Sequence, residues 1–194
     1  MRAARERTKA NKRKHRCKGR KKKTEKKLTI YCLSDSQGSG INTFNIADPT
    51  RLTPIQSDVF KLTRPGVNPQ RQEAPHPHQA ILDPTGNFLV VPDLGADLVR
   101  IFALNKTTLA YRAVTSLATA PGSGPRHAAF VVGTAKTFFY VINELDNTLV
   151  GYEVAYNTNA TLGFKQLFRT STHGDSSTRP NGTTAAEITL SVSS

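Results

Sequence analysis

The chain is poor in cysteine and has no long apolar run. Cys17 and Cys32 are its only cysteines, too few for the disulfide framework of a small secreted domain. No apolar stretch approaches the roughly 20 residues of a membrane-spanning helix. The N-terminal residues lack the apolar core of a signal peptide. We therefore exclude a disulfide-stapled fold, expect no membrane partner, and predict a cytoplasmic location.

Three glycosylation sequons keep a secreted protein open as an alternative. They are Asn105-Lys106-Thr107, Asn159-Ala160-Thr161 and Asn181-Gly182-Thr183. Such triplets are short and arise often by chance. A secretory origin would require that the true N-terminus is missing from the sequence.

Several common catalytic motifs are also absent. The sequence contains no Gly-x-Ser-x-Gly elbow, no zinc-binding helix motif and no Walker-type phosphate loop. No segment shows a convincing helical period of 3.6 residues. Short β-type runs separated by turns fill the chain from Leu28 onward, which predicts an all-β protein. We expect no cofactor and no metal.

Positive charge is confined to one end of the chain. Residues 1–27 hold 15 Lys or Arg residues against Glu6 and Glu25, whereas residues 28–194 hold 12 basic and 12 acidic residues. Like charges repel and leave little apolar surface to bury, so we expect a disordered tail over residues 1–27 and a folded domain over residues 28–194. No aromatic residue interleaves the charges, so a nucleic-acid partner is not expected.

An internal repeat sets the expected architecture. Pro77-His78 aligns with Pro125-Arg126 at an offset of 48, and Phe88–Val91 aligns with Phe138–Val141 at an offset of 50. A repeat near 50 residues built from short β-type runs is typical of propeller blades. The wholly apolar run Phe88–Val91 predicts a strand buried on both faces.

The predicted strands continue this pattern along the chain. A third copy of the repeat begins at Ala185. The expected strands are Leu28–Leu33, Ile41–Ile46, Asp58–Leu62, Gln79–Leu82, Phe88–Val91, Leu98–Leu104, Leu109–Ser116, His127–Val132, Thr137–Ile142, Leu149–Val154, Phe164–Arg169 and a last one opening at Ala185.

The repeated segments resemble one known family. PHPHQAILDPTGNFLVVPDLGADLVRIF, GSGPRHAAF, YVINELDNTLVGY and AAEITLS, together with CLSDSQGSGINTFNIADPTRLTPI, are similar to the seven-bladed β-propeller lactonases. That family includes bacterial 6-phosphogluconolactonases and fungal muconate-lactonizing enzymes. A closed ring needs about 350 residues at roughly 50 per blade. The resemblance therefore implies a partial propeller of three to four blades over residues 28–194.

The resemblance implies hydrolysis of a sugar-acid lactone without a metal. The partner would be a small-molecule lactone, and the oligomeric state is left open. Two alternatives remain, a cycloisomerase of the same fold and a propeller fragment that is inactive or serves only as an interaction module.

The family motifs also imply site residues. His78 and Arg126 lie at equivalent inner-strand positions, and Glu144 follows an apolar strand. These three are the expected catalytic residues, with His78 transferring protons at a near-neutral pKa, Arg126 also binding the anionic substrate and Glu144 acting as the base. His76 and Glu187 are expected to bind substrate.

Two observations limit these assignments. His76 and His78 form a His-x-His pair, but no third metal ligand is evident. The repeat also sets Asp93 against Glu144, which predicts that an acid at this position is not unique to one blade and that Asp93 is structural.

Overall fold

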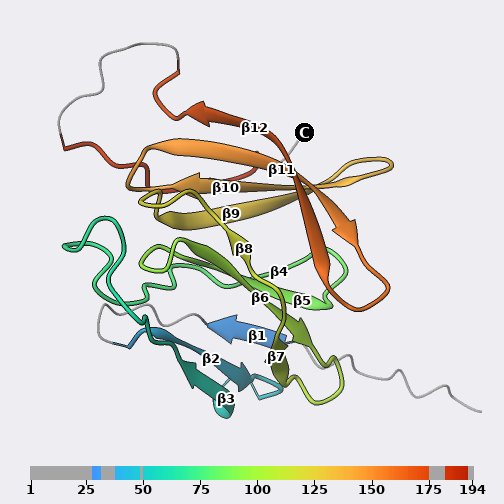
Figure 1. Ribbon diagram of the computed structural model, residues 1–194. Coiled ribbons are helices and arrows are strands. Elements are labelled where there is room, and N and C mark those ends of the chain that lie inside the picture. Colours follow the sequence, from blue (N-terminus) through green and yellow to red (C-terminus); the bar gives the residue numbers. More distant parts are fainter. Residues whose placement is uncertain (1–27, 32–37, 49, 175–181, 192–194) are drawn as a thin grey trace, which may run out of the picture.

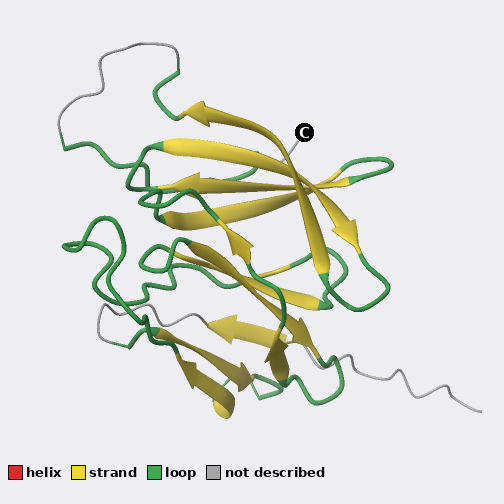
Figure 2. Ribbon diagram, viewed as in Figure 1, coloured by secondary structure: helices red, strands yellow, loops and turns green. Residues whose placement is uncertain are grey.

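A computed structural model describes residues 28–31, 38–48, 50–174 and 182–191. The predicted basic tail, both cysteines and the sequon asparagine Asn181 lie outside these residues. Within them the chain forms strands, turns and loops, and none of it is helical (Figure 2). The described part of the chain thus contains no helix that could cross a membrane.

In the described residues, twelve strands build three antiparallel sheets (Figure 1). The first sheet holds β1 (Leu28–Tyr31), β2 (Gly40–Asn45) and β3 (Thr53–Val59). The middle sheet holds β4 (Ile81–Leu82), β5 (Phe88–Asp93), β6 (Leu98–Leu104), β7 (Tyr111–Ala113) and β8 (Leu117–Ala118). The third sheet holds β9 (Pro125–Val132), β10 (Thr137–Asn143), β11 (Thr148–Tyr156) and β12 (Leu162–Ser171). Each sheet is an up-and-down meander, as in a propeller blade.

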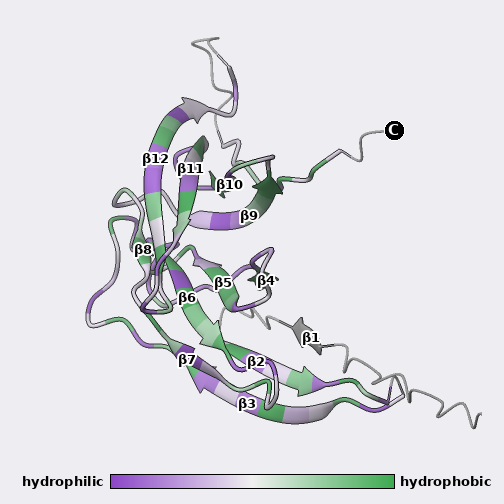
Figure 3. Ribbon diagram, turned by 90° about the vertical axis from the view of Figure 1, so that its right-hand side faces the viewer, coloured by the Kyte–Doolittle hydropathy of each residue, from purple (hydrophilic) through white to green (hydrophobic). Residues whose placement is uncertain are grey.

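The middle sheet packs between the other two, as the edge-on view of Figure 3 shows. Phe88 and Val90 on β5 face the third sheet, whereas Leu89 and Val91 face the first sheet. Successive side chains of a strand point to opposite faces, so a strand between two sheets must be apolar at every position. The prediction that Phe88–Val91 is buried on both faces is confirmed.

Two apolar cores join the layers. The core between the first and middle sheets contains Ile41, Leu89, Val91, Phe102 and Tyr111. The core between the middle and third sheets contains Phe88, Val90, Val99, Ile101, Ala128, Phe139, Val141, Val150, Tyr152, Val154 and Leu162. The larger core fixes the third sheet against the middle sheet, and the candidate site lies where the loops of these two sheets meet.

Three strand predictions need correction. The strand expected at Asp58–Leu62 begins earlier, at Thr53, and includes Pro54. Proline is tolerated there because β3 is an edge strand of its sheet. The strand expected at Leu109–Ser116 is only Tyr111–Ala113, with β8 following separately. Residues 182–191 of the third copy form no strand; instead Arg126 donates a hydrogen bond to the Ala186 carbonyl.

Candidate functional site

A buried carboxylate lies between two arginines where the middle and third sheets meet. Glu144 directly follows β10, and its side chain is only 8% exposed. Its Oε2 lies 2.8 Å from Arg126 Nε, near the start of β9. Its Oε1 accepts a hydrogen bond from Arg71, which lies in the loop between β3 and β4. Both oxygens of Glu144 are therefore paired with a guanidinium.

A one-residue shift in register at the start of β9, and another just before β4, sets where the side chains of the site residues point. The pairs Ile142–His127 and Asn143–Pro125 differ in register by one residue, which leaves Arg126 as the extra residue of a bulge. The pairs Ile81–Val90 and Pro77–Asp93 show the same shift in the middle sheet, and His78 is the repeat equivalent of Arg126. Bulges re-aim side chains and occur often beside active sites.

The loop before Arg126 is fixed by Asp97 of the preceding blade. The Asp97 carboxylate accepts hydrogen bonds from the backbone N–H groups of Gly122 (2.7 Å) and Gly124 (2.9 Å). Gly124 has a φ of +63°, and a Cβ there would lie 2.6 Å from Leu145 Cγ. Only glycine meets both conditions, and the two hydrogen bonds hold the loop from which β9 and Arg126 begin.

Arg71 is positioned by its buried neighbour. Gln72 is fully buried, and its side-chain amide donates to the Leu94 carbonyl at 2.9 Å. The Gln72 side-chain oxygen accepts from the Asn68 N–H at 3.0 Å. These bonds hold the loop against the turn after β5 while the Arg71 side chain stays 45% exposed.

His78 adjoins this cluster as a neutral imidazole. Burial, and after it the nearby positive charge of Arg126, lower its pKa from 6.5 to about 4. The His78 N–H donates to the Pro92 carbonyl, and its ring stands 6.3 Å from the ring of His127. The near-neutral pKa expected from sequence is therefore wrong, because desolvation disfavours the imidazolium form.

The structure does not bring His76 or Glu187 onto the Glu144 carboxylate. His76 Nε2 lies 3.0 Å from Glu73 Oε1, and the His76 backbone N–H donates to Asp93. Glu187 is 54% exposed and lies 2.8 Å from His127 Nδ1. The His76 side chain thus pairs within its own loop, and the Glu187 side chain ties the residue 182–191 segment to β9. Their expected role in substrate binding stays a prediction.

The turns after β5 and β10 correct the alignment of Asp93 with Glu144. Pro77 pairs with Asp93 as Pro125 pairs with Asn143, so Asp93 is the counterpart of Asn143. The counterpart of Glu144 is Leu94. Asp93 is fully buried and binds Arg100 at 2.7 Å, contacts that agree with its predicted structural role.

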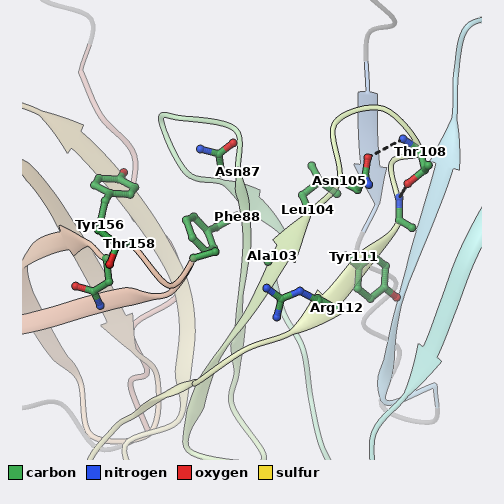
Figure 4. Close-up of a pocket in the computed structure, with 13 residues that line it drawn as sticks. Asn87, Phe88, Ala103, Leu104, Asn105, Thr108, Tyr111, Arg112, Tyr156 and Thr158 are labelled. Carbon is green, nitrogen blue, oxygen red and sulfur yellow. Dashed lines mark hydrogen bonds between the residues drawn. The ribbon is translucent and has the colours of Figure 1, made fainter.

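A separate hollow of the described surface lies away from this cluster (Figure 4). It encloses about 640 Å³ between the middle and third sheets, with Phe88, Leu104, Arg112 and Tyr156 among its 13 lining residues. Phe88 begins β5, whereas the Glu144 cluster lies beyond the other end of that strand. No carboxylate or histidine lines the hollow, so it offers no acid–base pair, and we place the candidate site at Glu144.

The arrangement suits acid–base chemistry on an anionic molecule. Two guanidiniums and one carboxylate give the cluster a net positive charge, and the neutral His78 ring adds a donor and an acceptor. Among the described residues no group of three or more His, Cys, Asp or Glu side chains could hold a metal ion.

Three stacked antiparallel meanders, repeated along the chain, are the architecture of a β-propeller protein. The family described as "Lactonase, 7-bladed beta-propeller" matches residues 21–194. The chain belongs to this family, and the resemblance noted in the sequence is confirmed.

Curated relatives of the chain are named as 6-phosphogluconolactonases. A probable 6-phosphogluconolactonase from Arthroderma benhamiae is 36% identical over 66% of this chain and 32% of its own length. The 6-phosphogluconolactonase of Bacillus subtilis is 37% identical over 55% of this chain and 29% of its own length. The chain thus aligns with about a third of each relative.

Solved structures agree on the fold. A putative 6-phosphogluconolactonase from Bacteroides fragilis matches with a TM-score of 0.59 and 25% identity, over 71% of this chain and 39% of that structure. The periplasmic gluconolactonase of Pseudomonas aeruginosa matches with a TM-score of 0.57 and 25% identity, over 74% and 37% of the two chains. The predicted all-β propeller class is confirmed, with three blades in the described residues.

Proposed function

We propose that the protein hydrolyses a sugar-acid lactone of the 6-phosphogluconolactone type at the Arg71–Glu144–Arg126 cluster. The observation that carries the proposal is a carboxylate held out of solvent between two guanidiniums, beside a neutral imidazole. The names of the relatives favour lactone hydrolysis over cycloisomerisation.

Each residue has a role in the proposed reaction. Glu144 accepts a proton from a water molecule whose oxygen attacks the lactone carbonyl carbon. Arg126 stabilises the negative charge that develops on the carbonyl oxygen. The ring C–O bond then breaks, and the ring oxygen takes the proton back from Glu144 to give the open-chain acid. His78, neutral at pH 7, orients the lactone by hydrogen bonding.

The electrostatics of the site support an anionic substrate. Lactone hydrolysis creates a carboxylate, and a phosphorylated lactone carries charge from the start. Guanidinium groups bind both anions through paired hydrogen bonds. Phosphorylated molecules do not cross membranes unaided, because charge is costly in an apolar medium. A phosphorylated substrate therefore supports a cytoplasmic location for this protein. The structural neighbour from Pseudomonas aeruginosa, in contrast, is described as a periplasmic gluconolactonase.

The test is a direct assay of the full 194-residue chain. 6-Phosphogluconolactone is generated in place, and its conversion to the acid is followed by NMR against the rate without protein. We expect acceleration by the wild type and none by a protein carrying both Glu144→Gln and Arg126→Gln. Equal rates with and without the folded protein would refute the proposed hydrolysis.

A further inference from the structure

We propose that Arg71 recognises the substrate's phosphate and, by leaving Glu144, frees that carboxylate to act as the base. This inference rests on the proposed function and adds a specificity-determining residue to it. Arg71 has no counterpart in the repeat motifs, since the residue 48 positions later is Thr119.

The substrate-free arrangement keeps Glu144 occupied. Arg71 binds Oε1, and Arg126 lies against Oε2 at 2.8 Å. A general base needs an oxygen within hydrogen-bond reach of the attacking water. With both oxygens paired to cations and only 8% of the side chain exposed, neither oxygen of Glu144 is free to face a water molecule until one arginine moves.

Arg71 is better placed to move than Arg126. Its side chain is 45% exposed, against 25% for Arg126. Arg126 extends from a strand and also donates to the Ala186 carbonyl. The Arg71 backbone is held through Gln72, so its guanidinium can swing away without displacing the loop.

A phosphate competes well for this guanidinium. The dianion offers several acceptor oxygens and more charge than one carboxylate, and arginine binds it in a bidentate way. An unphosphorylated lactone lacks this group and leaves Arg71 on Glu144. Phosphate on the substrate should therefore raise kcat as well as lower KM, because it releases the base.

Binding of the stable product tests the inference without relying on catalysis. Affinities for 6-phosphogluconate and for gluconate are measured in phosphate-free buffer for the wild type, Arg71→Gln and Arg71→Lys. Arg112→Gln is the matched control, since Arg112 is exposed and lines the separate hollow. We expect the wild type and the control to prefer 6-phosphogluconate at least about tenfold.

The variants decide the role of Arg71. In Arg71→Gln the preference should fall to near one through weaker binding of 6-phosphogluconate, and Arg71→Lys should restore part of it by supplying a point charge. The ¹³C carboxyl resonance of Glu144 should shift with 6-phosphogluconate in the wild type but not in Arg71→Gln. An unchanged preference in Arg71→Gln, or no preference in the wild type, overturns the inference.

A kinetic arm separates this inference from the proposed function. Added phosphite dianion should accelerate hydrolysis of unphosphorylated δ-gluconolactone by the wild type and not by Arg71→Gln. If the binding preference and the Glu144 shift depend on Arg71 while no lactone is hydrolysed, the proposed function fails and phosphate recognition by Arg71 stands. If the lactone is hydrolysed while the preference for 6-phosphogluconate does not depend on Arg71, the proposed function stands and phosphate recognition by Arg71 fails.

Discussion

Leu94 and Glu144 occupy the same position in successive blades, directly after β5 and β10. Their backbone N–H groups donate to equivalent carbonyls, Leu94 to His76 and Glu144 to Gly124. A position filled by leucine in one blade does not need a carboxylate for folding. The acid at Glu144 is therefore an addition to the repeat, which is what a functional residue on a repeated scaffold requires.

Replacing Glu144 should abolish activity while the fold survives. Glu144→Gln keeps the size and a hydrogen-bond acceptor but removes the base, so we expect kcat to fall about 10²–10⁴-fold. Glu144→Leu copies the preceding blade and should also fold. Circular dichroism and lactone hydrolysis measured together check this; a Glu144→Gln protein with wild-type kcat would exclude Glu144 as the base.

The Asp97 clamp should govern both stability and site geometry. Asp97→Ala removes two charge-assisted hydrogen bonds, to Gly122 and Gly124, and we expect a loss of about 3 kcal/mol in the free energy of unfolding. Urea denaturation measures this loss. Asp48, which caps an exposed turn through Thr50, provides a matched control: Asp48→Ala should leave the urea midpoint nearly unchanged, and equal effects would contradict a special role for Asp97.

The sequence predicted the blades well because each has a strong local signal. The continuous apolar run at Phe88 and the repeat of Pro77 and Pro125 both come from strand packing that every blade must satisfy. Arg71 had no such signal, because it lies in a polar loop and reaches Glu144 across 73 positions of sequence. Matching by residue type also misplaced Asp93, because it set this acid against Glu144 at an offset of 51, whereas strand pairing keeps the offset of 50 that holds at Phe88 and makes Asn143 its counterpart.

The depressed pKa of His78 predicts a specific pH dependence of stability. The pKa falls from 6.5 to about 4 on folding, so between these values the unfolded chain binds the proton and the native protein does not. The contribution of His78 to stability is complete above pH 6.5 and is lost as the pH drops toward 4.

A His78→Asn variant isolates this contribution. Urea unfolding at several pH values should show a steeper decline below pH 6.5 for the wild type than for His78→Asn, since the other histidines are common to both proteins. Parallel pH profiles for the wild type and His78→Asn would mean that His78 is not desolvated.

Opposite faces of the third sheet should respond differently to the loss of a phenyl ring. Phe139 is fully buried and packs against Phe130 and Phe164, with ring centroids 4.8 Å and 5.5 Å away. Phe168 is 39% exposed on the other face and contacts Tyr140 at 6.1 Å. We expect Phe139→Ala to cost about 3–5 kcal/mol and Phe168→Ala less than about 1 kcal/mol.

Urea unfolding followed by circular dichroism compares the two variants. Phe139→Leu is included because the alanine variant can lose the fold altogether, and it should cost less than Phe139→Ala. The core around Phe139 also fixes β9 against the middle sheet, so Phe139→Leu should weaken binding of 6-phosphogluconate while Phe168→Ala should not. Equal destabilisation by Phe139→Ala and Phe168→Ala would show that the outer face of the third sheet is packed in solution, contrary to the layer arrangement described above.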